Sequence, residues 1–177
     1  MIIQGKKIAL RSFKSEDADL LWDSVHNELI NKLTGTHATF TRKMIDKYIE
    51  QQITADDDER ASFVIAVGKN LQAVGEVVIN EIDHDNHSGS IRISLFSEHD
   101  LNKGYGTEAM RLMVDYGFSE LHLHRISLGV YAFNPRAIRV YEKIGFKQEG
   151  ILRDTLYWDG EYIDEITMSI LAHERLD

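Results

Sequence analysis

The sequence of 177 residues predicts an α+β fold, in which about four helices pack on a mixed, mostly antiparallel sheet of about seven strands. Three observations predict this class. Strand patterns at residues 63–67, 73–82 and 90–97 are separated by short polar turns, which favours an antiparallel meander. A strand, a helix and a strand then follow across residues 90–131, and this order requires a parallel crossover. Near the end of the chain, Asp159–Gly160 separates two further strand patterns and is a strong hairpin signal.

The first third of the chain begins with a strand pattern at residues 7–11 and continues with two helical patterns. Ser15 precedes the first helical pattern and is expected to be its N-cap, because its hydroxyl can accept a hydrogen bond from a free backbone N–H. A second helix is predicted to begin at Thr41, since apolar residues recur on one stripe from there to Ile53. The acidic run at residues 55–60 is expected to be a solvated connection to the strands that follow.

The second half of the chain alternates helical and strand patterns. Apolar residues at helical spacing follow a glycine-rich loop near residue 104, and residues 125–131 form the next strand pattern. Asn134 followed by Pro135 is a strong helix start, and that helix is expected to end at Gly145. The single proline and the absence of Ser/Gly-rich linkers predict one domain over residues 1–177.

Composition and charge exclude several classes of protein. The chain has no cysteine, which excludes disulfides and thiolate metal sites and suits a reducing compartment. No apolar run approaches the length that spans a bilayer, and no secretion signal is visible, so a cytoplasmic protein without a membrane partner is expected. The net charge of −9 argues against a nucleic acid partner, since phosphate binding needs clustered Lys and Arg. The same charge is compatible with an amine substrate, although solubility explains it more simply.

The most informative segment is a polar loop that leads directly into a helix. Its residues are, in order, Leu101, Asn102, Lys103, Gly104, Tyr105, Gly106 and Thr107. The start of a helix has backbone N–H groups without intrahelical partners and carries partial positive charge. Glycines have no Cβ and therefore allow phosphates to approach these amides closely. The segment lacks the spacing of a Walker A motif, and it predicts a site for a diphosphate of another kind.

Two segments of the chain resemble motifs of one enzyme superfamily. Residues 102–109 look like the acetyl-CoA pyrophosphate loop of the GNAT acyltransferases, and residues 134–146 are similar to its segment N-x-x-A-x-x-x-Y-x-K-x-G-F. The order of the elements also agrees, so the resemblance extends over essentially the whole chain. It is most similar to the branch that contains ribosomal-protein N-terminal acetyltransferases and spermidine acetyltransferases. The resemblance implies a GNAT-like fold and acetyl-CoA as cosubstrate.

The resemblance also implies which residues contact the cosubstrate. The loop residues 101–107 are implied to bind the diphosphate through backbone amides, with Leu101 at a position where the family usually has Gln or Arg. Phe96 is implied to offer a backbone N–H freed from the sheet, which would polarise the thioester carbonyl. Asn134 and Ala137 are implied to contact acetyl-CoA at the start of the later helix.

Acetyl transfer to an amine also needs an acid for the leaving thiolate and a route for the proton of the amine. Tyr141 matches the motif tyrosine and is the expected general acid, although its spacing also suits a core residue. Glu76 and Glu81 lie in one strand pattern and are expected to face opposite ways. Glu81 is preferred as the base because it shares its face with Val77 and Ile79 and matches an acidic position in spermidine enzymes. A solvated strand-end carboxylate and a water chain without a dedicated base remain open alternatives.

Histidine pairs provide a competing interpretation. His84 with His87 and His122 with His124 are possible metal ligands, but neither pair has the i, i+4 spacing of a helical zinc site. We therefore expect no metal.

The sequence predicts an acetyl-CoA-dependent N-acetyltransferase that moves the acetyl group to a primary amine by direct attack in a ternary complex. The acceptor is a polyamine, a peptide or protein N-terminus, or a small amine. A non-catalytic acetyl-CoA-binding sensor is the alternative, and a homo-oligomer is possible. The acceptor site is expected between the first two helices and the closing hairpin, with four side chains as candidates: Trp22, Glu28, Trp158 and Glu161.

Overall fold

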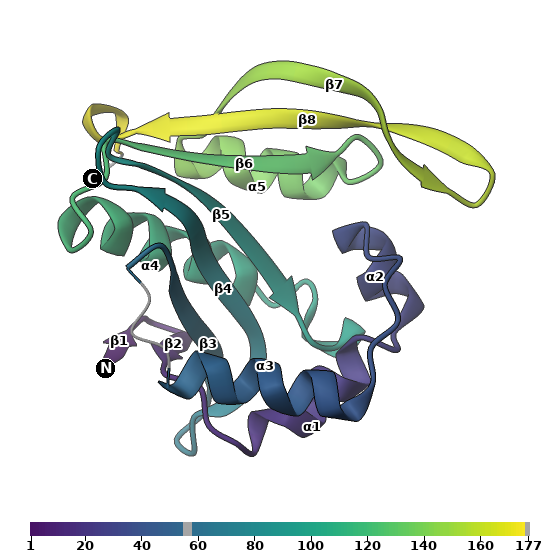
Figure 1. Ribbon diagram of the computed structural model, residues 1–177. Coiled ribbons are helices and arrows are strands. Elements are labelled where there is room, and N and C mark those ends of the chain that lie inside the picture. The colour runs from purple at the N-terminus through teal and green to yellow at the C-terminus, as the bar shows by residue number, and fades with distance from the viewer. Residues whose placement is uncertain (55–57, 176–177) are drawn as a thin grey trace.

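The computed structural model describes residues 1–54 and 58–175 and has the predicted α+β fold (Figure 1). The strands are β1 (Ile2–Gln4), β2 (Ile8–Arg11), β3 (Ala61–Val67), β4 (Gln72–Asp83), β5 (Ser88–Leu95), β6 (Arg125–Tyr131), β7 (Lys147–Trp158) and β8 (Glu161–Leu171). The α-helices are α1 (Asp17–Ser24), α2 (Glu28–Thr34), α3 (Arg42–Thr54), α4 (Tyr105–Ser119) and α5 (Pro135–Ile144), with short 3-10 turns η1 (Glu98–Asp100) and η2 (Ala172–Glu174). Part of the acidic run, residues 55–57, lies outside the described residues.

All eight strands form one sheet in the order β1-β2-β3-β4-β5-β6-β8-β7. Its single parallel pairing joins β5 to β6, and this pairing extends only from Ser88↔Arg125 to Ser90↔Ser127. β5 stays paired with β4 as far as Leu95, and β6 stays paired with β8 as far as Tyr131. The two halves of the sheet therefore diverge beyond the third pair and leave a wedge between β5 and β6 (Figure 1).

Helices cover the two faces of the sheet unequally. The larger core cluster packs α4 and α5 against one face, with central residues that include Ile79, Met110, Met113, Ile126 and Met168. The smaller cluster packs α1 and α3 against the opposite face of the N-terminal half, and it includes Leu21, Ile45, Ile49, Val64 and Phe96. This smaller cluster contains no residue of β6, β7 or β8, so α1 and α3 do not pack on that half of the sheet.

Local sequence signals fixed most of the element ends. Asn134 caps α5 by accepting a hydrogen bond from the Ala137 N–H at 3.1 Å, and Gly145 ends this helix in the left-handed conformation. The β7–β8 turn has positive φ at both Asp159 (50°) and Gly160 (85°), as expected for a two-residue hairpin turn of type I′. The meander, the crossover and the closing hairpin are therefore confirmed.

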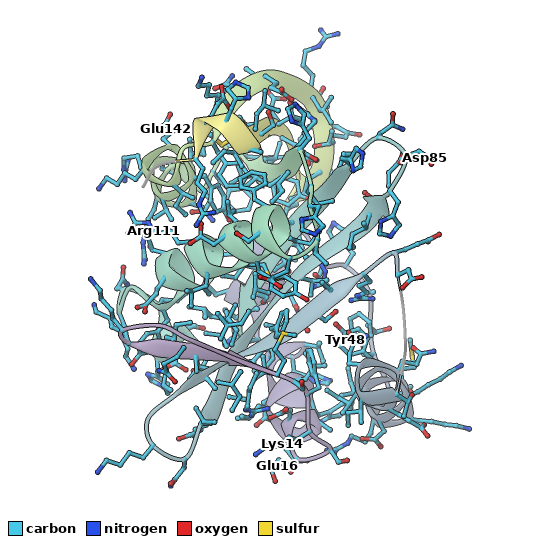
Figure 2. All side chains as sticks on the ribbon, turned by 90° about the vertical axis from the view of Figure 1, so that its left-hand side faces the viewer. Lys14, Glu16, Tyr48, Asp85, Arg111 and Glu142 are labelled. Carbon is cyan, nitrogen blue, oxygen red and sulfur yellow. The ribbon has the colours of Figure 1, made fainter. Side chains whose placement is uncertain are left out.

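Three details of the N-terminal third differ from the prediction. β1 and α2 were not expected, which explains eight strands and five helices instead of seven and four. Ser15 is not the N-cap of α1, because Glu16 occupies that position without a side-chain capping bond. Instead the buried Asp17 carboxylate accepts the Lys14 N–H at 2.8 Å and pairs with Arg11, which fixes the start of α1 to β2. Lys14 and Glu16 themselves lie at the outer edge of the molecule (Figure 2).

Candidate active site

The inner edge of β5 exposes backbone groups toward the wedge. The Phe96 N–H donates to the Val74 carbonyl of β4 at 2.9 Å, so the prediction that Phe96 has a free amide is wrong. In an antiparallel pair, successive residues direct their backbone groups to alternate sides of the strand. The pairing of β4 with β5 is regular from Gly75↔Leu95 to Asn80↔Ser90, so this alternation holds along the end of β5. The amides of Ile93 and Leu95 therefore face the wedge, and Leu95 takes the position expected for Phe96.

The inner edge of β6 is open in the same way. The Ala132 N–H donates to Asp164 of the β8 side at 2.9 Å, so even-numbered residues bond toward β8. The backbone groups of Gly129 and Tyr131 face the wedge by the same alternation. The Tyr131 carbonyl accepts the Asn134 N–H at 2.9 Å, but the other backbone groups along the two strand edges face one narrow space, which is suited to a ligand that carries amide groups of its own.

The glycine loop lies directly after β5 and carries a run of free amides. η1 precedes it, and the Leu101 N–H still donates to the Glu98 carbonyl at 3.1 Å. From Asn102 to Thr107, six consecutive amides donate to no protein acceptor in the described part of the chain. Helix α4 closes its first backbone bond only with the Glu108 N–H, which donates to Gly104 at 3.1 Å. Free amides at a helix start form an anion site, and two diphosphate charges suit it.

The loop is held by the turn between β1 and β2. The Glu108 carboxylate accepts hydrogen bonds from the backbone amides of Lys6 and Lys7, the latter at 3.1 Å. The Lys7 ammonium in turn donates to the Lys103 carbonyl at 3.2 Å. These contacts join residues about a hundred positions apart in the chain, so sequence patterns could not reveal them. They also place the positive charge of Lys7 beside the free amides of the loop, which Leu101, with its apolar side chain, does not provide.

Tyr141 lies on α5, and its hydroxyl has no partner among the described residues. The side chain is half-buried among core residues and meets the ring of Phe146 at 6.0 Å. Within the described chain, no donor or acceptor contacts its hydroxyl. Burial raises the pKa of Tyr141 to about 12, so the phenol is protonated at neutral pH. A neutral hydroxyl without a partner can donate its proton to a group that develops negative charge.

The two carboxylates of β4 differ from the expectation in their burial. Glu81 is solvent-exposed with φ 55° and lies in the register shift between Asn80 and Asp83, beside the closed end of the wedge. The argument that placed Glu81 on the face of Val77 and Ile79 is wrong, because this irregularity breaks the alternation. Glu76 is the buried carboxylate, and it faces the helices α1 and α3.

A pocket of about 370 Å³ lies between this face of the sheet and the first three helices. Its lining residues are Leu21, Ser24, Val25, Ile30, Asn31, Thr34, Thr36, Phe40, Met44, Ile45, Tyr48, Glu76, Arg92, Ser94 and Phe96. The expectation that the first helices line an acceptor site is consistent with this pocket. Trp22, Glu28, Trp158 and Glu161 do not line it. Trp158 instead stacks on His37 at 4.7 Å, where the hairpin tip meets the segment after α2.

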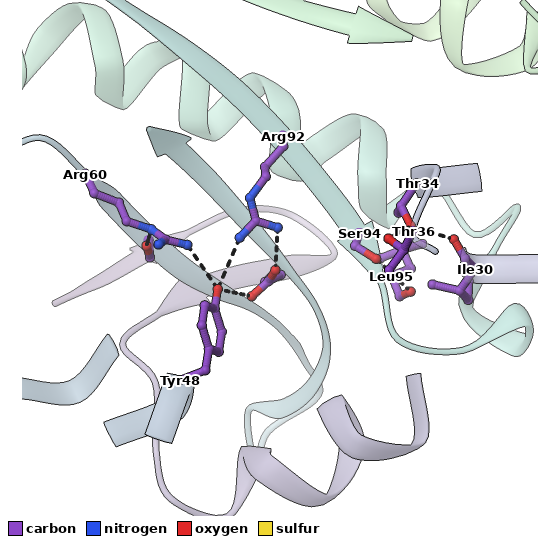
Figure 3. A network of polar contacts seen from close by, with 10 residues as sticks. Ile30, Thr34, Thr36, Tyr48, Arg60, Arg92, Ser94 and Leu95 are labelled. Atoms are coloured by element: carbon purple, nitrogen blue, oxygen red, sulfur yellow. Dashed lines mark hydrogen bonds and ion pairs between the residues drawn. The ribbon is translucent and has the colours of Figure 1, made fainter. Parts of the chain in front are cut away.

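A polar network is at the base of the pocket, and the phenol of Tyr48 is its centre (Figure 3). The Tyr48 hydroxyl donates to Glu76 Oε2 at 2.9 Å and accepts from Arg60 at 3.1 Å and from Arg92 at 3.2 Å. Arg92 also donates to Glu76 Oε1 at 2.7 Å. Burial, followed by the Glu76 charge, raises the pKa of Tyr48 to about 12, so this hydroxyl stays neutral.

A second carboxylate lies on the C-terminal half of the sheet. Glu165 extends across β6 over Gly129, where any Cβ would overlap its carboxylate oxygen. Tyr131 neighbours it, and burial together with the Glu165 charge raises the pKa of this tyrosine. The Tyr131 hydroxyl reaches Gly35 at the end of α2, where a Cβ would overlap it. Glu165 is half-buried, and in the described chain no cation or hydrogen-bond donor contacts it.

Metal clusters and membrane-spanning helices are two further features for which the described residues can be searched. The described residues contain no group of three or more His, Asp or Glu side chains arranged to hold a metal ion. None of the described helices combines the length and the apolar character needed to cross a membrane.

The sequence is similar to those of known acetyltransferases. A family model described as an acetyltransferase (GNAT) domain matches residues 7–147. The spermidine N(1)-acetyltransferase of Vibrio cholerae is 35% identical over 69% of this chain and 69% of its own length. The probable N-acetyltransferase YjcK of Bacillus subtilis is 33% identical and covers 96% of this chain and 97% of its own length.

Solved structures show the same fold. A spermidine N-acetyltransferase from Vibrio cholerae in complex with CoA and spermine superposes with a TM-score of 0.87 at 24% identity, over 98% of this chain and 100% of that chain. A GNAT-family acetyltransferase from Bacillus anthracis gives a TM-score of 0.82 at 25% identity, with coverage of 98% and 100%.

Proposed function

The chain belongs to the GNAT acetyltransferase family, and we propose that it moves the acetyl group of acetyl-CoA to a primary amine by direct attack in a ternary complex. The protein is an N-acetyltransferase, like its curated relatives. The observation that carries the proposal is the wedge between β5 and β6, which opens at the same end of β5 as the loop of free amides. One elongated molecule with a diphosphate at one end and amides along its length fits both the loop and the wedge.

The residues present fit acetyl-CoA in three places. The amides of residues 102–107 offer donors for the diphosphate, and Lys7 adds positive charge next to them. The wedge edges offer N–H and C=O groups for the amides of the pantetheine arm. The Leu95 amide is suited to hydrogen-bond the thioester carbonyl, where negative charge develops during attack. Acetyl-CoA supplies the activated acetyl group, and the chain supplies orientation and charge stabilisation. Asn134 and Ala137, whose capping bond begins α5, are proposed to contact the cosubstrate beside the mouth of the wedge.

Tyr141 is proposed as the general acid. Its hydroxyl is protonated at neutral pH, since burial raises the pKa of Tyr141 to about 12, and it has no competing partner in the described chain. A phenol of this kind can protonate the departing thiolate without first breaking another hydrogen bond. The core interpretation of its helix spacing is compatible with this role, because the ring packs while the hydroxyl remains free.

Glu165 is proposed to receive the ammonium of the acceptor and to take up its proton. Its carboxylate lies over Gly129, at the strand edge that borders the wedge, and no cation among the described residues pairs with it. Glu76, by contrast, has both oxygens engaged by Arg92 and Tyr48. An amine must lose a proton before or during attack, and an unpaired carboxylate beside the reacting centre is a suitable base.

Thiol release from acetyl-CoA tests this function. The purified protein is assayed against spermidine, N-terminal peptides, amino acids and aminoglycosides, and acetyl-CoA binding is measured in parallel by calorimetry. We expect binding without any acceptor and release only when one acceptor class is added. Absence of acetyl-CoA binding would refute the assignment of the loop and wedge, whatever the acceptor.

A further inference from the structure

The pocket beneath β5 lies beside the reacting centre and has no assigned ligand. Arg92, Ser94 and Phe96 line it with side chains from one face of β5, whereas the Leu95 amide between them faces the wedge. A group in the pocket is therefore adjacent to the carbonyl that Leu95 is proposed to polarise. The pocket volume of about 370 Å³ is within the range of ligand sites. Its position makes it the natural site for the body of the acceptor.

The walls of this pocket are mainly apolar. The side chains that form them come from α1, α2, α3 and the segment before α3, and they include Leu21, Val25, Ile30, Phe40, Met44 and Ile45. Hydroxyl and amide groups of Ser24, Asn31, Thr34 and Thr36 are interspersed among them. Apolar walls with a few polar groups bind an aliphatic or aromatic body and fix its orientation.

The ionised side chains at the base of the pocket carry more positive than negative charge. Glu76 and Arg92 are the only ionised side chains among the lining residues, and Arg60 approaches the same phenol from behind. The Glu76 charge is already paired with Arg92, and its side chain is only 6% exposed, so this carboxylate is poorly accessible to a ligand cation. Two guanidinium groups against one carboxylate leave one positive charge in excess, in a protein whose net charge is −9.

Arg92 keeps capacity for a further partner. Its Nη1 donates to Glu76 and its Nη2 to Tyr48, which uses two of the five guanidinium N–H groups. The side chain remains 46% exposed, whereas the Glu76 side chain is 6% exposed. The remaining donors of Arg92 are therefore accessible from the pocket, and a guanidinium binds carboxylates well.

On the basis of the proposed function, we propose that this pocket binds an acceptor amine with an apolar body and a carboxylate, and that Arg92 binds the carboxylate. A polyamine fits the pocket poorly, because it would bring further positive charge to a base whose one carboxylate is buried and paired with Arg92. Curated relatives in Vibrio cholerae and Escherichia coli differ in this respect, since their names give spermidine as the substrate.

Direct binding tests the pocket independently of turnover. Phenylpropanoate and phenylpropanamide share one apolar body and differ in the charge that Arg92 would meet. With CoA present, calorimetry is expected to show the carboxylate binding about tenfold tighter or more, since hydrogen bonds to charged groups are the stronger class. Equal affinity of the two compounds, or tighter binding of spermidine, would overturn the proposal. Because these probes carry no reactive amine, failure of the acetyltransferase proposal would not affect this result.

Turnover provides the second measurement. Thiol release is compared for L-phenylalanine, L-phenylalaninamide, aminohexanoate and spermidine. A preference in kcat/KM of about tenfold or more is expected for an amino acid over its carboxamide. The carboxamide has the less basic amine, so its own reactivity works against this preference. Release that is fastest with spermidine or with the carboxamide would contradict the inference while supporting the acetyltransferase itself.

Variants assign the effect to Arg92. Arg92→Gln should reduce the carboxylate-to-carboxamide affinity ratio to about one. Because this change leaves Glu76 buried without its cation, the double variant Glu76→Gln/Arg92→Gln repeats the measurement with a neutral pair. Arg42→Gln, which removes an exposed arginine of α3 outside the pocket, is the matched control and should keep the ratio. An unchanged ratio in both pocket variants would overturn the assignment.

Discussion

Removal of the Asp17 carboxylate should destabilise the fold more than any other single charge change in the N-terminal third. Asp17 and Arg11 are 2% and 5% exposed, and two hydrogen bonds of 2.7 and 2.8 Å join them. Asp17→Ala leaves a buried guanidinium without its anion and the Lys14 N–H without its acceptor. Breaking a buried pair in this way costs about 3–5 kcal/mol.

Urea unfolding followed by circular dichroism measures this loss. With a urea m-value of about 2 kcal/mol/M, the midpoint should fall by about 1.5–2.5 M. Glu16→Ala is the matched control, because Glu16 is 75% exposed and pairs with Lys14 at 3.4 Å. That change should cost at most about 1 kcal/mol. A loss below about 1 kcal/mol for Asp17→Ala would refute the argument that this pair is a buried unit.

Three further predictions concern the site and its surroundings. Gly104→Ala should weaken acetyl-CoA binding and destabilise the fold by about 1 kcal/mol, because residue 104 has φ 86°. Gly106→Ala should leave the stability unchanged and still weaken binding, because the added Cβ would meet only Ile93, at 3.7 Å. Calorimetry that finds an unchanged acetyl-CoA affinity for both variants would contradict the diphosphate assignment. Tyr141→Phe should lower kcat by about 100-fold or more and leave the acetyl-CoA affinity nearly intact. Because burial raises the pKa of Tyr141 to about 12, deprotonation of this phenol should not reduce wild-type turnover below about pH 11. Hydrogen bonds from Arg125 and then Ser169 lower the pKa of Glu149 to about 2, so the stabilisation by this carboxylate should be present above about pH 5 and disappear as the pH falls toward 2. The melting temperatures of Glu149→Gln and the wild type should therefore converge at low pH. A difference in melting temperature that stays constant with pH would argue against the ion pair.

Predictions from sequence succeeded where the signal was local. Asn134–Pro135 and Asp159–Gly160 each determine backbone angles within a few residues, and both elements formed as expected. α2 carried a comparable signal that was missed. Asn27 caps it through the Ile30 N–H at 3.0 Å, and Gly35 ends it with φ 66°. A helix of seven residues offers too few apolar positions for periodicity to reveal it.

Predictions of the site failed where they depended on strand register. The choice of Glu81 over Glu76 assumed regular alternation, which one shift near Asn80 interrupts. The amide predicted to be free at Phe96 is paired with Val74, because a difference of one residue reverses the side to which the backbone groups point. Glu165 had no sequence signal, because its proposed role rests on a glycine of a neighbouring strand and on the lack of a cation partner among the described residues.

The short pairing of β5 with β6 has a thermodynamic consequence. Three residue pairs join the two halves of the sheet, and the remaining inner edges are left for a small molecule. A ligand that binds there only in the folded state raises the free energy of unfolding, by about 2.7 kcal/mol at a concentration of a hundred times its Kd. If the cosubstrate binds as proposed, it is a structural part of the sheet as well as a reactant. The amount of folded enzyme in a cell would therefore rise and fall with the supply of the molecule it consumes.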